Sequence, residues 1–178
     1  MCAKKINEDE DYGMEGSKMM LLFEDTLKEI YWAEKTIIKS LLKMSKKAVD
    51  PQLVQILESH LTESEEQIDK LEKVFALLGR KPQSRKTEVV TNMMEDVRIL
   101  LETKEPGASR DAEIILAARK SEHFEIATYS HLCTYARKLE IDQVLKILES
   151  ILKEEEHADV SLASVGDSTI QIQAKQAS

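Results

Sequence analysis

The stretch that decides the fold is residues 27–41, LKEIYWAEKTIIKSL. Its apolar side chains recur at alternating steps of four and three, the spacing of one face of an α-helix. The residues on this face are Leu27, Tyr31, Ile38 and Leu41. Glu34 also falls on it, at a position where packing alone favours leucine or isoleucine. A buried carboxylate is costly unless something neutralises it, so this helix is expected to place Glu34 at a cation site.

Three other helical segments interrupt their apolar faces in the same way. His60, Glu63 and Gln67 fall on the face of residues 51–78, whereas residues 109–136 and 142–162 carry acidic residues near mid-length. Antiparallel packing of four such helices brings their carboxylates toward one level of a bundle, where they can share one or two cations. The predicted metal ligands are Glu34, Glu63, Glu122, Glu125, Glu155 and His60.

The composition favours a single all-α domain. The chain has 178 residues, of which 42% are hydrophobic, and it contains five glycines and three prolines. Only 4% of the residues are aromatic, and leucine, isoleucine, glutamate and lysine are abundant. This balance fits helices much better than a sheet. A chain of this length buries one core, so we expect one domain.

The charge of the chain excludes some partners. The formal net charge is −8, which argues against binding to nucleic acid or to an anionic membrane surface. Two divalent cations would cancel about half of this charge. Cys2 and Cys133 form no CxxC pair, and no signal segment or membrane-spanning run is evident. We therefore expect a soluble cytoplasmic protein, with Cys133 as a small core residue.

The expected domain boundaries follow from breakers and caps. Residues 1–16 are predicted to be a flexible acidic arm, residues 17–164 the bundle and residues 165–178 a polar tail. Ser17 is expected to begin the first helix, and Asp50 followed by Pro51 the second. Gly79 is expected to close that second helix.

Residues 80–110 are predicted to be a crossover that contains an extra helix. A connection of this length lets the second and third bundle helices run parallel, which is the topology of ferritin-like bundles. Met93, Met94 and Val97 add apolar residues beyond those that a four-helix core needs. They make the crossover a candidate interface for a homodimer.

Three blocks of sequence carry a resemblance to a known family. They are residues 22–35 (LFEDTLKEIYWAEK), residues 60–63 (HLTE) with Gln67, and residues 122–129 (EHFEIATY). They resemble the YciF-like branch of the ferritin-like superfamily, which comprises bacterial stress-associated proteins of undefined activity. The resemblance implies a ferritin-like four-helix bundle, a homodimer and a dinuclear metal site built from helix carboxylates, each of them terminal or bridging.

The second bundle helix departs from the wider ferritin-like pattern. The residue three positions after Glu63 is Glu66, so the usual Glu-x-x-His pair is missing there. His60 lies one turn earlier on the same face. It is expected to act as a ligand or as a hydrogen-bond donor to one.

The phase of the last bundle helix stays open at the level of sequence. Glu154 and His157 form a Glu-x-x-His pair, whereas the apolar spacing favours Glu155 facing inward with Asp159 one turn later. Neighbouring positions differ by about 100 degrees around a helix, so Glu154 and Glu155 are rivals for the site.

Three functions are compatible with these residues. The first is a redox-active centre, with iron favoured and manganese as the alternative, that reacts with O2 or peroxide. The second is metal binding or buffering without turnover. The third is a structural or partner-binding bundle without metal, although its inward carboxylates would then repel one another and have to take up protons. Sequence names neither the metal nor a substrate.

Overall fold

The protein is all α-helical, as predicted. A computed structural model describes residues 8–176, with side chains described for residues 16–166. Within residues 8–176 there are five helices and no strand. The helices are α1 (Glu8–Lys47), α2 (Pro51–Leu77), α3 (Glu88–Thr103), α4 (Ala108–Lys138) and α5 (Asp142–Gln176). None of them, over the described residues, is both long and apolar enough to cross a membrane.

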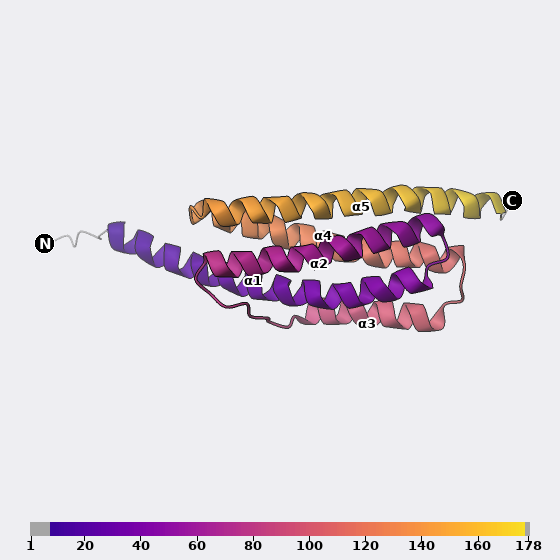
Figure 1. Cartoon of the computed structure of the whole chain (residues 1–178), viewed down its shortest axis with the longest axis horizontal. Helices are drawn as coiled ribbons and strands as arrows, with labels where there is room; N and C mark the ends of the chain where they lie inside the picture. The colour runs from indigo at the N-terminus through magenta and orange to yellow at the C-terminus, as the bar shows by residue number, and fades with distance from the viewer. Residues whose placement is uncertain (1–7, 177–178) are drawn as a thin grey trace, which may run out of the picture.

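Four of the helices form the bundle, and α3 lies outside it (Figure 1). Short connections make α1 and α2 one antiparallel pair and α4 and α5 another. The two pairs meet where α1 packs against α4 and α2 packs against α5. The crossover returns the chain to the far end of the bundle, so α2 and α4 run in the same direction, as the sequence predicted.

The ends of α2 follow the predicted capping signals. The Asp50 side chain accepts a hydrogen bond from the Gln52 amide at 2.8 Å, and Pro51 occupies the first helical position. At the other end Gly79 takes a φ of +67°, and the Arg80 amide donates to the Phe75 carbonyl at 2.9 Å. Glycine adopts this left-handed conformation without strain, which lets the chain leave the helix and enter the crossover.

The turn between α1 and α2 is held by a residue of α4 that the sequence patterns did not single out for this role. Asp111 is buried, and its carboxylate accepts hydrogen bonds from the Val49 amide at 3.1 Å and the Asp50 amide at 2.7 Å. These bonds satisfy amides that precede the first turn of α2. They fix one end of the α1–α2 pair against α4 and thereby set the level at which the two helices meet.

The first and last helices extend beyond the ends that the sequence predicted. Helix α1 begins at Glu8 rather than at Ser17, and α5 continues through Gly166 to Gln176. There is no proline between residues 8 and 47 or after residue 142, so nothing in the covalent chain ends either helix at the expected position. The remainder of the predicted arm, residues 1–7, and residues 177–178 of the predicted tail lie outside the described residues.

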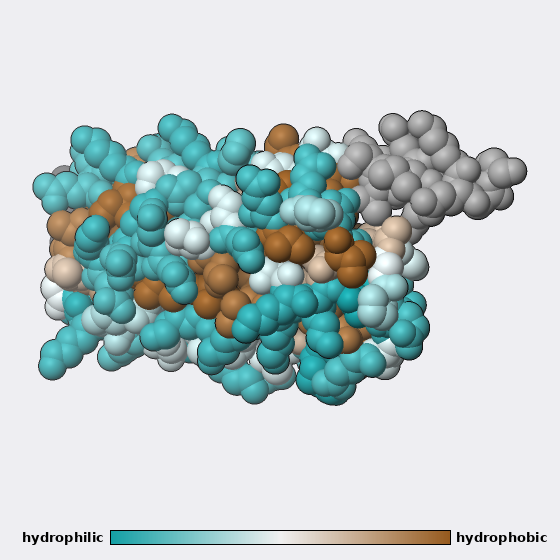
Figure 2. All heavy atoms as spheres, turned by 45° about the vertical axis from the view of Figure 1, so that its right-hand side comes forward, coloured by the Kyte–Doolittle hydropathy of each residue, from teal (hydrophilic) through white to brown (hydrophobic). Residues whose placement is uncertain are grey.

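The apolar residues of the crossover are used within the chain. Val97 is buried and Met94 packs against the core, because α3 covers α1 and α4. Of the three residues proposed for an interface, Val97 is therefore already covered by the protein itself. The face in Figure 2 is mainly hydrophilic, with apolar side chains in smaller groups between polar ones. Cys133 is buried and free, as expected for a core position.

Candidate metal centre

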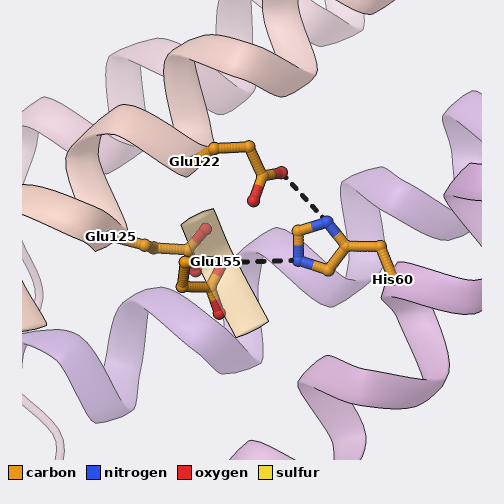
Figure 3. Close-up of side chains that lie close together, drawn as sticks. All are labelled: His60, Glu122, Glu125 and Glu155. Carbon is orange, nitrogen blue, oxygen red and sulfur yellow. Dashed lines mark ion pairs between the residues drawn. The ribbon is translucent and has the colours of Figure 1, made fainter. Parts of the chain in front are cut away.

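Four ionisable side chains from three helices converge in the middle of the bundle (Figure 3). His60 comes from α2, Glu122 and Glu125 come from α4, and Glu155 comes from α5. His60 is 3% exposed and each glutamate is 0% exposed. Each residue offers one possible ligand atom, a ring nitrogen of His60 or a carboxylate oxygen of a glutamate, and these four atoms all lie within 4.8 Å of one another. These four residues are called the central cluster below.

The polar atoms of the central cluster are close together but lack hydrogen-bond partners. His60 Nδ1 lies 3.0 Å from a Glu122 oxygen, and His60 Nε2 lies 3.7 Å from a Glu155 oxygen. Despite these distances, the contacts do not have hydrogen-bond geometry. Within the described residues, neither ring nitrogen of His60 and neither carboxylate oxygen of the three glutamates has a hydrogen-bond partner. Buried polar groups in folded proteins are nearly always paired, so a group of unpaired ones requires an explanation.

A metal ion fits this arrangement. Nitrogen and oxygen ligands lie roughly 2.0–2.2 Å from a transition metal, so ligand atoms on opposite sides of one ion are about 4.4 Å apart. The 4.8 Å limit of the central cluster is close to that span. Three carboxylates and one imidazole suit cations such as iron or manganese. The central cluster can therefore hold a metal ion with small side-chain movements.

Glu34 of α1 lies beside the central cluster and is fixed by a tyrosine. Its side chain is 0% exposed, and the Tyr129 hydroxyl donates a hydrogen bond to Oε1. Oε2 has no partner within the described protein. Tyr129 follows Glu122 and Glu125 on the same face of α4. Glu34 therefore has one oxygen hydrogen-bonded to Tyr129 and one oxygen that can bind a metal ion.

Burial and mutual repulsion favour the protonated forms of these carboxyl groups. Burial raises the pKa of Glu34 to about 7, against the opposing effect of the Tyr129 hydrogen bond. Burial and the charges of Glu34 and Glu122 raise the pKa of Glu155 to about 11. The pKa of Glu125 is also raised well above its usual range, chiefly by burial. Without a cation, this layer retains protons at neutral pH.

His60 responds to two opposing influences. Burial is the largest single influence and lowers the pKa of the imidazole, but the neighbouring carboxylates, with Glu122 first, together raise the pKa overall. Smaller contributions in the same direction come from Glu34 and Glu63. The imidazole is therefore held in a negative environment, which also favours a metal cation at its ring nitrogens.

The structure places Glu63 apart from the central cluster. Its side chain is only partly buried, and one oxygen accepts a hydrogen bond from the Ser59 hydroxyl at 3.3 Å. His60, one turn earlier on α2, occupies the buried position instead. Of the two α2 residues predicted as ligands, the structure therefore brings His60 into the cluster and leaves Glu63 nearer to the surface.

The structure also resolves the phase of α5. Glu155 points into the bundle, whereas Glu154 accepts hydrogen bonds from Gln67 at 3.1 Å and from Lys70. His157 is exposed. Asp159, one turn after Glu155, is paired outside the central cluster. The inward position that the apolar spacing favoured is thus occupied by Glu155, without Asp159 beside it.

Together these features define the class of the protein, a four-helix bundle with a buried histidine–carboxylate cluster at its centre. The chain belongs to the family described as Domain of unknown function (DUF892), which it matches over residues 18–175. Protein YciF of Escherichia coli (strain K12) is 31% identical over 145 residues, which are 81% of this chain and 87% of that protein. The predicted YciF-like family is therefore confirmed.

Solved structures support the fold. The Escherichia coli stress protein YciF matches with a TM-score of 0.82 at 29% identity, over 86% of this chain and 97% of that chain. YcfI from Rhodopseudomonas palustris matches with a TM-score of 0.78 at 34% identity, over 82% and 92% of the two chains. A protein from Xanthomonas campestris pv. campestris matches with a TM-score of 0.70 at 19% identity, over 89% and 97%, and shows the fold alone.

Proposed function

We propose that this chain is a ferritin-like metal-carboxylate protein with a dinuclear centre. The proposed ligands are the central cluster and Glu34, and the proposed metal is iron, with manganese as the alternative. The observation that carries the proposal is the set of unpaired, fully buried ligand atoms on His60, Glu122, Glu125 and Glu155. A bound cation supplies the interactions that these atoms lack and removes the cost of burying them.

Charge balance supports two ions rather than one. Four buried glutamates, Glu34, Glu122, Glu125 and Glu155, carry four negative charges when ionised, and two divalent cations carry four positive charges. A single divalent cation leaves two negative charges in a region of low dielectric, where their repulsion is strong. Carboxylates that bridge two ions relieve this repulsion, and Glu125 and Glu34 both have an oxygen available for such a role.

The proposed activity is a redox reaction with O2 or peroxide in a stress response. Bound iron supplies the electrons for this chemistry. The residues of the chain bind the ions and exclude bulk water, and each carboxylate has a second oxygen that can bind an ion. Tyr129 orients Glu34 through its hydroxyl. The complete burial of the glutamates fits a small reactant better than an organic substrate. The description of Escherichia coli YciF as a stress protein agrees with this role.

Metal binding without turnover is the second candidate function. The closed surroundings of the central cluster favour it, because all three of its glutamates are 0% exposed. A site that holds ions for later release needs no space for a second reactant, whereas oxidation of the metal by peroxide or O2 does.

One experiment in two stages separates these functions. Protein purified without chelator is first analysed for metal, and we expect about two iron or manganese ions per chain from the charge balance above. The ferrous protein is then mixed with O2 or peroxide in a stopped-flow instrument. Fast oxidation with repeated turnover supports the redox function, and stable stoichiometric binding supports buffering. Protein that takes up neither metal, even when it is supplied in excess, contradicts both.

A further inference from the structure

A small pocket reaches the central cluster from the surface between α2 and α5. Its volume is about 80 Å³. His60 forms part of its lining, and Glu63 and His157 line it from the two helices. Ala158 and Ser161 contribute small side chains on the α5 side. Because His60 is 3% exposed and neither ring nitrogen makes a hydrogen bond within the described residues, the pocket leads to a side chain that can bind a metal ion.

A larger groove of about 560 Å³ lies beside this pocket. Apart from Glu63 of α2, the residues that line it belong to α5. Glu63 and His157 line both the groove and the inner pocket, so they stand where the two spaces meet. A cation that approaches His60 through the pocket between α2 and α5 therefore meets the Glu63 carboxylate and the His157 imidazole.

The charges along the groove single out Glu63. Three carboxylates line it, and two of these already have a cationic partner: Arg137 lies 3.0 Å from Glu149, and Lys70 contacts Glu154. Glu63 instead accepts a hydrogen bond from the Ser59 hydroxyl at 3.3 Å. Lys146 and Lys153 also line the groove, and their positive charges disfavour a cation beside them.

We propose that Glu63 and His157 form an access port at which a divalent cation docks before it passes to His60 and the central cluster. This inference rests on the proposed metal-binding function. A carboxylate and an imidazole together bind cations such as Fe²⁺, Mn²⁺ or Co²⁺. Two ligands that are partly or fully exposed bind weakly, which suits a position that must release the ion inward. The ligands of the central cluster are buried, more numerous and more negative, so an ion is bound more tightly there than at the port.

The port explains why α2 places Glu63 on the same face as His60 but closer to the surface. The two residues are three positions apart, nearly one helical turn. A permanent ligand at Glu63 is expected to be buried with the others, whereas Glu63 is only partly buried and lies outside the central cluster. The structure thus separates two roles on one helix, with His60 holding the ion and Glu63 delivering it.

The test measures how fast metal-free protein takes up Co²⁺, followed by the visible absorption of the bound ion in a stopped-flow instrument. The variants are Glu63→Gln, His157→Asn and the double variant, with Ser161→Leu to narrow the inner pocket sterically. The matched control is His123→Asn, which changes an exposed histidine of α4 that pairs with Asp159 and does not line the pocket. All variants are compared with wild type for helix content before use.

We expect the double variant to take up Co²⁺ about tenfold more slowly than wild type, because electrostatic focusing at a charged opening changes association rates by at least that factor. Ser161→Leu is also expected to slow uptake, because its larger side chain narrows the pocket. The final amount of bound Co²⁺ is expected to stay unchanged, as is the rate for His123→Asn.

Three results overturn the port. If the variants and wild type load at equal rates, the ion uses another path, while the proposed metal-binding function stands. If Glu63→Gln lowers the final amount of Co²⁺, Glu63 is a permanent ligand rather than a docking residue. If wild-type protein binds no Co²⁺, the port fails together with the proposed function.

Discussion

Two carboxylates one helical turn apart on α5 show what distinguishes the candidate site from the rest of the acidic surface. Glu155 is 0% exposed, and neither of its oxygens has a hydrogen-bond partner within the described protein. The Asp159 side chain is 18% exposed and is bound by Arg119 at 2.7 and 3.2 Å and by His123 at 3.2 Å. Burial raises the pKa of Glu155 to about 11, whereas Arg119 lowers the pKa of Asp159.

The difference lies in the partners that the neighbouring helix supplies. Arg119 of α4 neutralises Asp159 and His123 contacts it, but at the level of Glu155 the same helix contributes Glu122 and Glu125. Like charges at that level repel unless a proton or a metal ion is present. The chain thus supplies a partner for Asp159 from its own side chains, whereas Glu155 depends on a proton or a metal ion from solution.

The largest expected effect is on metal binding. Glu155→Gln removes a charged ligand and should weaken metal affinity by about 100-fold or more, since loss of even an outer-sphere contact costs 10–100-fold. Asp159→Asn should leave affinity unchanged, because Asp159 lies outside the central cluster. Titration of both metal-free variants with Mn²⁺ or Co²⁺ measures the difference. Equal affinities in the two variants would remove the distinction between the two positions.

The second prediction concerns the pH dependence of metal-free protein. The pKa of Glu34 is about 7 in the folded protein against 4.5 in the unfolded chain, so the folded state binds more protons between these values. The resulting stability is fully present below about pH 4.5 and is lost as the pH rises through 7. Glu125 and Glu155 extend the loss to higher pH, because their pKa values are also raised.

We therefore expect the unfolding temperature of metal-free protein to be roughly 5–10 °C lower at pH 8 than at pH 5.5, which corresponds to a few kcal/mol in a chain of this size. Thermal unfolding followed by circular dichroism measures it. Saturating Mn²⁺ should abolish or reverse the trend, because bound cations replace the protons. A metal-free protein that becomes more stable from pH 5.5 to pH 8 would contradict the assignment.

The third prediction concerns the tyrosine that holds Glu34. Tyr129→Phe leaves Glu34 Oε1 without its hydroxyl donor, which should destabilise metal-free protein by about 1–3 kcal/mol at pH 8. The pKa of Glu34 should also rise further, because the lost hydrogen bond had been lowering it. Chemical denaturation at pH 6 and pH 8 measures both effects.

Tyr135→Phe is the matched control for Tyr129→Phe, since Tyr135 lies on the same helix and its ring contacts His131 rather than a buried carboxylate. A loss of stability of the same size in both variants would show that Tyr129 acts through packing and not through Glu34.

The smallest expected effect is at the paired carboxylate. Asp159→Asn breaks partly exposed ion pairs with Arg119 and His123, which are worth about 0–1 kcal/mol. The loss should shrink as salt is added, because exposed charges are screened. Denaturation in 0.05 and 0.5 M NaCl measures it. A salt-independent loss of several kcal/mol would mean that Asp159 is as critical to the bundle as the buried glutamates.

Much of this fold was predictable because its signals are local. The spacing of apolar residues located the bundle helices, and Asp50, Pro51 and Gly79 located both ends of α2. The length of the crossover implied the parallel arrangement of α2 and α4. The ends of α1 and α5 were misplaced because composition alone suggested an arm and a tail where no residue stops the helix.

The candidate site was predictable in part. Apolar neighbours fixed the inward phase of Glu34, Glu122 and Glu125, and the same spacing favoured Glu155 over Glu154. The different depths of His60 and Glu63 were not predictable, because both lie on one face of α2 and their burial depends on how closely α5 approaches. Contacts between helices, such as that of Asp111 with the α1–α2 turn, leave no periodic signal in either segment.

Anomalous X-ray diffraction from crystals grown with Mn²⁺ or Fe²⁺ tests the central claim most directly. We predict two anomalous peaks in the middle of the bundle, within about 2.3 Å of ligand atoms of His60, Glu122, Glu125 and Glu155, and with Glu34 bound to one of them. Full occupancy of these positions would establish the metal centre. The absence of any peak there, or a peak confined to the exposed pair of His123 and Asp159, would contradict it.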